Sequence, residues 1–290
     1  MTNQYSRMKI KYLLVLLSVC LLLPALCGCS PDAIIIGESS PVNDEPEIYF
    51  FAAGDADAIL VTHQNFSMLV DCGNKGFGDT ILAHLEECGI DRLDYLVITH
   101  FDKDHVGGAA QVLRSVPVSL VLQSVETEES NIPGKYTKAL NKDGIAVQTV
   151  TQPTTLEAGG LTVEILPPSF ETYGEKTDNN ASLILSVIYG DNRVLLAGDA
   201  EDERLDEFIS GCDGTYDLIK MPHHGKWSGS IKDLLETTQP SVAVICCEER
   251  SDVSDKTEKA LNEGNVKAFF TGNGPVTAIL TGNEITVKQN

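Results

Sequence analysis

Basic side chains are scarce in this sequence: 21 Lys and Arg residues stand against 42 Asp and Glu residues, and the formal net charge is -21. Nucleic-acid binding relies on Lys and Arg to neutralise phosphates, and a strongly acidic surface repels polyanions. The composition therefore argues against strong binding of duplex DNA, although it does not exclude a small anionic substrate in a pocket. Short repeats and low-complexity stretches are absent too, and a hydrophobic content of 42% is ordinary for a globular protein.

Long apolar runs are also absent, except at the N-terminus. Three basic residues, Arg7, Lys9 and Lys11, precede a mainly apolar run over residues 12–26. A basic start followed by about 15 apolar residues predicts a secretory signal, and such a run is too short to span a bilayer comfortably. The sequence therefore predicts export of the protein and does not suggest several membrane spans.

The apolar run ends in Leu-Cys-Gly-Cys at residues 26–29, which resembles the lipobox of bacterial lipoproteins. We therefore predict that residues 1–28 are removed and that a lipid on Cys29 anchors the protein to the outer face of the bacterial cell membrane. The alternative is an ordinary signal peptide with an incidental cysteine. Residues 29–46 are typical of a tether. Removal of residues 1–28 moves the formal charge from -21 to -24, because three basic residues and no acidic one are lost.

The number of cysteines after Cys29 is odd, so at least one thiol is free or pairs with another chain. Their apolar or strand-like surroundings favour single buried residues over a disulfide framework. The five are Cys72, Cys88, Cys212, Cys246 and Cys247.

Residues 47–290 are expected to form one large domain whose elements divide into two comparable halves. In the first half, apolar periodicity predicts strands at 48–52, 58–62, 68–70, 93–99, 118–122 and 146–150, and helices at 79–88, 106–115 and 136–142. In the second half it predicts strands at 161–166, 182–189, 193–197, 218–221, 242–246, 266–270, 276–280 and 284–288, and helices at 201–210, 231–237 and 256–263. Mixed elements in two such halves indicate two packed sheets with helices outside.

Ligand-type residues are concentrated in one loop directly after the buried strand at 93–99. His100, Asp102, Asp104 and His105 fall within six residues. Imidazole and carboxylate groups suit zinc, manganese or iron, and four of them on one loop can serve two ions about 3.5–4 Å apart. The alternative is a polar surface loop with incidental histidines, but two of the six histidines in the chain lie here.

Two further strand ends carry residues of the same kind. Asp199 follows the strand at 193–197, in a position suited to bridging two metal ions, and His223 and His224 follow the strand at 218–221. Each feature alone is weak, because Gly-Asp turns and paired histidines are common. Three strand ends with ligand-type residues together predict a metal site, because side chains at the ends of strands can converge at one edge of a sheet.

Short motifs succeed one another along the chain: Asp71-Cys72-Gly73, the loop from His100 to His105 with Gly107-Gly108, Gly198-Asp199, and His223-His224-Gly225. This series is similar to the successive motifs of the metallo-β-lactamase superfamily. Residues 53–60, 179–183 and 220–225 resemble more closely the hydrolase domain at the C-terminal end of bacterial competence DNA-uptake channels. The resemblance covers residues 47–290. It implies an α/β (α+β) fold, a four-layer αββα sandwich with metals in a groove at one edge of the sheets.

The resemblance also implies a set of ligands for two divalent ions, zinc or manganese. It does not decide between His223 and His224; we take His223 as the ligand and assign His224 to proton donation or to a hydrogen bond with a ligand. The implied ligands are His100, Asp102, Asp104, His105, Asp199 and His223.

Three departures from the superfamily pattern bear on the metals and the substrate. Asp102 stands where many members carry a second histidine, and the third histidine of that first site is missing, with Asn179 or Asn180 nearest. A site richer in oxygen raises the odds of manganese or of a weak first metal. Lys226 and Trp227 follow Gly225 where small residues are usual, so Trp227 either shapes the substrate groove or packs on the loop.

Other polar residues near these motifs have more modest expected roles. Asp57 and Asp71 are more often structural than ligands in such strand positions, although Asp71 has the additional option of a hydrogen bond to a ligand histidine. Asn180, Lys226 and Trp227 are candidates for contact with the substrate or with the ligands.

The oxygen-rich first site and the missing histidine, together with what the resemblance implies, favour metal-dependent hydrolysis of a phosphoester, most of all a small or single-stranded phosphodiester, at the outer face of the membrane. Asp104 and Asp199 would orient the attacking hydroxide, and His224 or Lys226 would assist the leaving oxygen. Lys220, Lys226 and Lys232 are close enough in sequence to form a small basic patch. The alternatives are a lactam, ester or thioester hydrolase, which the missing histidines disfavour, and a non-catalytic binding lipoprotein that retains the fold.

Overall fold

The computed structural model describes residues 44–128, 130–169, 173 and 177–290. The predicted signal segment 1–28, Cys29 and most of the predicted tether 29–46 lie outside the described residues, and they stay predictions. Within the described ranges, no helix is both long enough and apolar enough to cross a membrane. The described residues belong to one compact unit.

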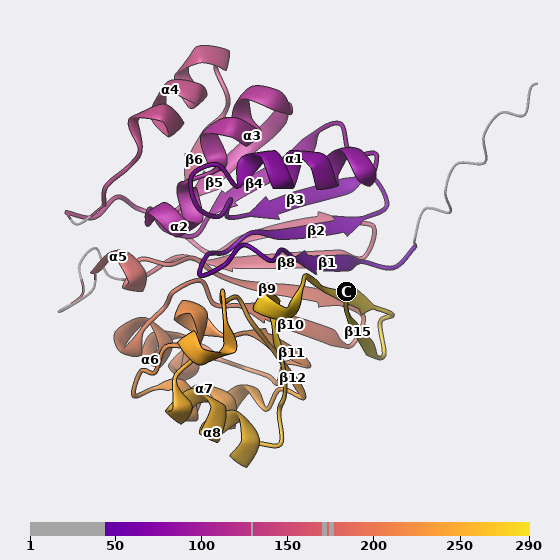
Figure 1. The fold of residues 1–290 in the computed structure, drawn as a ribbon, viewed down its shortest axis with the longest axis vertical. Helices are drawn as coiled ribbons and strands as arrows, with labels where there is room; N and C mark the ends of the chain where they lie inside the picture. The colour runs from indigo at the N-terminus through magenta and orange to yellow at the C-terminus, as the bar shows by residue number, and fades with distance from the viewer. Residues whose placement is uncertain (1–43, 129, 170–172, 174–176) are drawn as a thin grey trace, which may run out of the picture. The chain divides into compact units, whose positions relative to one another are not determined.

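Two mixed β-sheets form the middle of this unit (Figure 1). The first sheet has the strand order β15-β14-β1-β2-β3-β4-β5-β6. Its strands are β1 (Glu47–Phe50), β2 (Ile59–His63), β3 (Phe66–Val70), β4 (Leu93–Ile98), β5 (Val118–Gln123), β6 (Val147–Thr149), β14 (Val276–Leu280) and β15 (Ile285–Gln289).

The second sheet has the strand order β13-β12-β11-β10-β9-β8-β7. Strands β10 to β13 run parallel to one another, whereas β7 to β10 are antiparallel. Its strands are β7 (Thr154–Ala158), β8 (Leu161–Leu166), β9 (Ile184–Tyr189), β10 (Asn192–Leu196), β11 (Leu218–Lys220), β12 (Val242–Ile245) and β13 (Lys267–Phe270).

Helices cover the outer face of each sheet. Figure 1 shows α1, α3 and α4 on one side of the pair of sheets and α6, α7 and α8 on the other. The α-helices are α1 (Gly78–Glu87), α2 (Lys103–Val106), α3 (Ala109–Ser115), α4 (Gly134–Asp143), α5 (Thr177–Asn180), α6 (Asp202–Gly211), α7 (Ile231–Thr238) and α8 (Asp255–Glu263). Short 3-10 turns are η1 (Pro222–Gly225), η2 (Arg250–Asp252) and η3 (Thr271–Asn273).

Three apolar cores hold these four layers together. The central core lies between the sheets, and β8 shows why: Leu161, Val163 and Ile165 are buried in alternation with Thr162 and Glu164, because successive side chains of a strand point to opposite faces. A second core lies under α1, α3 and α4, and a third under α6, α7 and α8. The expected four-layer αββα sandwich is therefore confirmed.

Two local expectations differ from the structure. The helix expected over 106–115 begins at Ala109 as α3, and the ligand-bearing loop before it contains a short helix, α2. Gly107 and Gly108 lie between the two helices, where the chain passes too close to other backbone for a side chain. A Cβ on Gly108 would lie 2.3 Å from the carbonyl oxygen of Cys72. Strand β7 was not expected at all, because its half-exposed sequence, Thr-Thr-Leu-Glu-Ala, lacks an apolar run.

Candidate metal centre

The candidate ligands lie where strands of both sheets end. β4 leads to Thr99 and His100, β10 leads to Asp199, and β11 leads to the turn η1 that carries His223 and His224. Backbone hydrogen bonds join these ends: Leu183 N donates to the carbonyl of Thr99 (3.0 Å), and His223 N donates to that of Gly198 (3.2 Å). The three predicted clusters therefore lie together at one edge of the sheets, as the sequence predicted.

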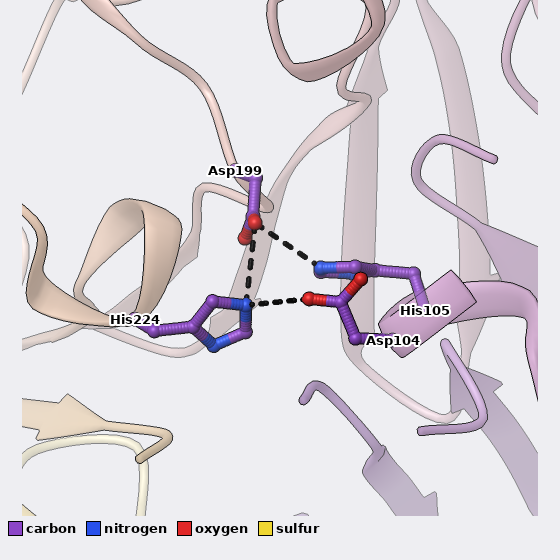
Figure 2. A group of neighbouring side chains, drawn as sticks. All are labelled: Asp104, His105, Asp199 and His224. Carbon is purple, nitrogen blue, oxygen red and sulfur yellow. Dashed lines mark ion pairs between the residues drawn. The ribbon is translucent and has the colours of Figure 1, made fainter. Parts of the chain in front are cut away.

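Four side chains form the centre of this edge: Asp104, His105, Asp199 and His224 (Figure 2). One ligand atom from each lies within 4.8 Å of the others. Asp199 Oδ2 is 3.3 Å from His105 Nε2 and 3.2 Å from His224 Nε2, and Asp104 Oδ2 is 3.3 Å from His224 Nε2. Two imidazoles and two carboxylates suit zinc, manganese or iron.

Hydrogen bonds fix the ring nitrogens of His105 and His224 that face away from this centre. His105 Nδ1 donates a hydrogen bond to Asp71 Oδ2 (2.8 Å), and His224 Nδ1 donates one to the carbonyl of Cys246 (3.0 Å). In the neutral imidazole these contacts place the proton on Nδ1, so a metal ion that displaces the second proton would meet the lone pair of each Nε2. Both Nε2 atoms are buried and make no hydrogen bond to any described residue. A metal ion would satisfy both, so the residues present fit the implied cofactor.

The backbone at this edge is held in an uncommon conformation. Asp71, His223 and His224 have φ angles of 57°, 46° and 53°, in the left-handed region that L-residues seldom adopt. Each such residue costs about 1–3 kcal/mol and persists only where surrounding contacts fix it. At His224 this backbone, together with the bond to Cys246, directs the ring into the centre.

The charges of the four central side chains support one another. Burial opposes ionisation of Asp104, but the contact with the His224 imidazole and the charge of His105 outweigh it and lower the pKa of Asp104 to about 2. Burial lowers the pKa of His224, but the charge of Asp199 and the contact with Asp104 raise it to about 9. Burial also lowers the pKa of His105, but the charges of Asp199 and Asp71 outweigh it and hold that pKa well above its ordinary value. Burial raises the pKa of Asp199, but the charges of His224 and His105 outweigh it and hold that pKa well below its ordinary value. Without metal, protons on the imidazoles therefore neutralise the carboxylates.

His223 lies at the margin of the centre instead of within it. Its Nε2 is 3.9 Å from Asp199 Oδ2, and its Nδ1 is 2.8 Å from Glu201 Oε1. Lys226 Nζ is 3.0 Å from His223 Nε2. The geometry therefore favours His224 as the ligand and His223 as the proton-handling residue, the reverse of the assignment made from the sequence. Glu201 was not singled out by the sequence analysis; its position two residues after Asp199 was the only available signal.

A buried lysine lies behind the centre. Lys220 is fully buried, forms an ion pair with Asp57, lies 3.6 Å from Asp199 Oδ1, and donates a hydrogen bond to the carbonyl of Gly198 (2.9 Å). Burial lowers the pKa of Lys220, but the charges of Asp57 and Asp199 outweigh it and raise that pKa above its ordinary value. Lys220 therefore cannot belong to the surface basic patch expected from the sequence. A lysine inside an otherwise apolar strand was the signal that it needs a buried partner.

The remaining predicted site residues have other surroundings. Asn180 Oδ1 accepts hydrogen bonds from the backbone N–H groups of Glu201 (3.0 Å) and Arg204 (3.4 Å), at the start of α6. Trp227 packs against the core under α6, α7 and α8, and Lys256 Nζ lies 5.9 Å from the centre of its ring. These contacts favour a packing role for Trp227. Its role in shaping a substrate groove stays a prediction.

His100 and Asp102 form a separate part of the site, beside the four central residues. His100 is fully buried, its ring centroid lies 4.1 Å from that of His105, and its Nε2 lies 3.8 Å from Asp102 Oδ2. All six residues that the resemblance implied as ligands, together with His224, therefore lie at this one edge. They do not form a single cluster.

A family model described as the metallo-beta-lactamase superfamily matches residues 52–249. The chain therefore belongs to the metallo-β-lactamase superfamily, as its motifs and its fold indicate.

Relatives within this superfamily are competence proteins. The chain is 27% identical over 224 residues to ComE operon protein 3 of Bacillus subtilis, which covers 70% of this chain and 28% of that protein. It is 28% identical over 246 residues to competence protein ComA of Neisseria gonorrhoeae, which covers 80% of this chain and 33% of that protein. The chain thus spans between a quarter and a third of the length of these relatives. The expected resemblance to competence proteins is confirmed.

A solved structure shows the same fold. The metallo-beta-lactamase fold protein YhfI from Bacillus subtilis matches with a TM-score of 0.55 and 12% sequence identity, covering 84% of this chain and 100% of that protein. At this identity the match shows the fold alone, and function has to be argued from the site.

Proposed function

We propose that the protein is a metal-dependent hydrolase of phosphodiesters, small or single-stranded, at the outer face of the bacterial membrane. The observation that carries the proposal is the centre of Asp104, His105, Asp199 and His224, in which two buried Nε2 atoms face two carboxylates. Divalent ions held by such groups lower the pKa of a bound water and offset the negative charge that develops on phosphoryl oxygens.

Two carboxylates of the chain, those of Asp104 and Asp199, are placed to orient an attacking water. Asp104, whose pKa is lowered to about 2, is ionised throughout the physiological range and accepts hydrogen bonds only. Asp199 is buried and faces both central histidines, so it can hold charge at the middle of the site. Both carboxylates are thus ready to orient a water for attack without rearrangement during the reaction.

The group of Glu201, His223 and Lys226 is suited to the leaving oxygen. Glu201 fixes the Nδ1 side of His223, and Lys226 Nζ contacts the opposite nitrogen. A proton held between Lys226 and His223 Nε2 lies beside Asp199, at the margin where a leaving group would depart. This arrangement supports general acid assistance, which contributes about 10²–10⁴-fold in enzymes.

The charge distribution supports a small or single-stranded substrate. Lys220 is buried with Asp57, and Lys232 lies 3.5 Å from Glu236, so neither is a free positive charge for a duplex backbone. Lys226 lies at the site itself. With a formal charge of -21 on the whole chain, attraction of a long polyanion is not expected.

The test is a side-by-side assay of the purified protein on a bis-aryl phosphodiester, short single-stranded DNA and a chromogenic cephalosporin, each with zinc and with manganese. We expect turnover of the phosphodiesters, and we expect Asp104→Ala to lower the rate by about 100-fold or more, as when a preorganised electrostatic group is lost. Asp213→Ala, a change of an exposed carboxylate, is the matched control. Turnover of the cephalosporin alone would favour a lactamase, and inactivity on all three with metal bound would favour a binding protein.

A further inference from the structure

The two carboxylate oxygens of Asp199 have different surroundings. Oδ2 faces the metal centre, 3.3 Å from His105 Nε2 and 3.2 Å from His224 Nε2 (Figure 2). Oδ1 is buried, makes no hydrogen bond to any described residue, and lies 3.6 Å from Lys220 Nζ. The carboxylate therefore presents one oxygen to the imidazoles and the other to an ammonium group.

Two further contacts fix the ammonium of Lys220 beside Asp199. Nζ forms an ion pair with Asp57, and it donates a hydrogen bond to the carbonyl of Gly198 (2.9 Å), the residue before Asp199. An ammonium has three N–H donors, so one donor remains for Asp199 Oδ1 after these two contacts. Lys220 thus contacts the backbone that carries Asp199 and faces its side chain.

The register of the second sheet explains why this lysine lies here. β10 and β11 run parallel, and Leu196 of β10 pairs with Lys220, so the lysine is beside the strand end that leads to Asp199. Lys220 is fully buried and Asp57 is 1% exposed. A buried ion pair often stabilises a fold no better than apolar residues of similar size. Packing alone therefore does not account for the lysine, whereas an action on its polar neighbours does.

Asp57 belongs to a second buried group with the spacing of metal ligands, together with Asp71 and His105. Both of its carboxylates already have partners in the chain. His105 Nδ1 donates a hydrogen bond to Asp71 Oδ2 (2.8 Å), and Asp57 pairs with Lys220. The ammonium supplies the positive charge that a metal ion would otherwise bring to Asp57. The Asp57–Lys220 pair is therefore a fixed support behind the metal centre.

We propose that Lys220 is a positioning residue for Asp199: its ammonium holds Oδ1, so that Asp199 binds metal through Oδ2 alone. The inference rests on the metal centre of the proposed function and not on the identity of the substrate. Carboxylates bind metal ions through one oxygen or through both. Without the ammonium, the Asp199 carboxylate is free to turn and to bind through both oxygens, which raises the number of ligand atoms around the metal.

The test compares forms of the whole protein loaded with Co²⁺, whose visible absorption weakens as the number of ligand atoms increases. Asp57→Asn keeps the ammonium and is the matched control. Asp57→Asn combined with Lys220→Met removes the ammonium together with the carboxylate that it neutralises, so the net charge equals that of the wild type. We expect Asp57→Asn to keep the wild-type cobalt spectrum and the double variant to lose visible absorption.

Crystal structures of the zinc-loaded proteins measure the same change directly. We expect Asp199 to bind zinc through one oxygen in the wild type and in Asp57→Asn, and through both oxygens in the double variant. A change in the binding mode of one carboxylate is not a result that simple damage to the fold would produce.

A second double variant, Asp57→Asn with Lys220→Gln, guards against a loss of folding, because it keeps an amide donor for the Gly198 carbonyl. The amide is neutral, so we expect the same loss of cobalt absorption. An unchanged spectrum in either double variant, or an equal change in Asp57→Asn alone, overturns the inference. Phosphodiester turnover with unchanged spectra in the double variants would defeat this inference alone, whereas the expected spectra without any turnover would defeat the proposed function alone.

Discussion

At the scale of single residues, three of the four histidines at the site share one arrangement. In each of them a neighbouring oxygen accepts from Nδ1–H: Thr99 for His100, Asp71 for His105, and the carbonyl of Cys246 for His224. The second ring nitrogen is then directed at carboxylates. Metal-binding histidines are commonly oriented by such outer hydrogen bonds. The sequence showed which histidines were candidates but not which nitrogen each would present, because the acceptors come from distant parts of the chain.

The raised pKa of His224 predicts how metal affinity depends on pH. With that pKa at about 9, His224 is protonated at neutral pH, and a metal ion has to displace the proton. Apparent zinc affinity should therefore rise at least about tenfold per pH unit between pH 7 and 9. Calorimetry in buffers of different ionisation enthalpy measures the released protons; binding without proton release would contradict the assignment.

The stability of the metal-free protein should fall as the pH rises, whereas metal affinity rises. The stability that charged His224 confers is fully present below the unfolded-state pKa of about 6.5 and is lost as the pH rises through about 9. Thermal unfolding in the presence of a chelator should therefore show falling stability from pH 6.5 to 9, while zinc stabilises the protein increasingly over the same range.

Lys220 offers a prediction about stability. Lys220→Met would leave Asp57 and Asp199 as buried carboxylates without their cation, and breaking such a pair costs about 3–5 kcal/mol. We expect that loss in the free energy of unfolding, measured in urea with a chelator present. Lys232→Met breaks only an exposed pair with Glu236 and should cost about 0–1 kcal/mol.

A double variant separates the buried charge from the packing of the lysine stem. Asp57→Asn combined with Lys220→Met removes the unpaired carboxylate and should recover part of the lost stability, because the two residues are in contact. If Lys220→Met is no more costly than Lys232→Met, the buried ion pair does not have the role assigned to it.

At the scale of elements, the ends of the strands could be predicted from the sequence, but the contacts between elements that are distant in sequence could not. The apolar strands β4, β10 and β11 and the polar residues after them could be read directly, because buried strands have continuous apolar sequence. The role of Glu201 could not, since it depends on the start of α6 lying against the turn after β11 that carries His223. β7 was missed because its side chains are only partly buried.

The break between α2 and α3 gives a prediction at this scale. Gly108→Ala would place a Cβ 2.3 Å from the Cys72 carbonyl, in backbone that cannot easily move, because Cys72 N is bonded to the carbonyl of His105 (2.7 Å). We expect destabilisation of about 1–3 kcal/mol in urea unfolding, the usual cost of overpacking. Gly211→Ala, where a Cβ would meet no atom within 4 Å, is the control and should be nearly neutral.

The Gly108→Ala substitution should also affect metal binding. Because the same backbone carries Asp104 and His105, Gly108→Ala should also weaken zinc binding, whereas Gly211→Ala should not. A Gly108→Ala variant with wild-type stability and metal affinity would show that the close approach is not required.

At the scale of the whole molecule, the described unit places its candidate metal ligands at one edge of two sheets, and the chain carries an excess of acidic residues. An exported, membrane-attached protein would have this centre outside the cell, where it could act on phosphodiesters that reach the surface. The relatives are larger proteins of which this chain covers about a quarter to a third, so the attachment proposed here has to be tested on the chain itself.

The final prediction concerns that attachment. Residues 26–29 end an apolar run in Leu-Cys-Gly-Cys, and a lipid on Cys29 would hold a soluble domain at the membrane without a spanning helix. In the bacterial host, we expect the wild type in the membrane fraction, released by detergent and not by high salt. Cys29→Ala should appear in the soluble exported fraction or stay unprocessed at higher mass.

Cys88→Ala is the matched control, because Cys88 is an exposed cysteine at the C-terminal end of α1 and lies outside the predicted motif. It should fractionate like the wild type, and mass spectrometry of the N-terminal peptide should find the acyl chains on Cys29 in both. One acyl chain gives only marginal membrane binding, so stable attachment requires at least two on this residue. If Cys29→Ala remains in the membrane fraction with wild-type mobility, the anchor lies elsewhere or is absent, and the proposed place of action at the membrane fails with it, whereas the metal centre would be unaffected.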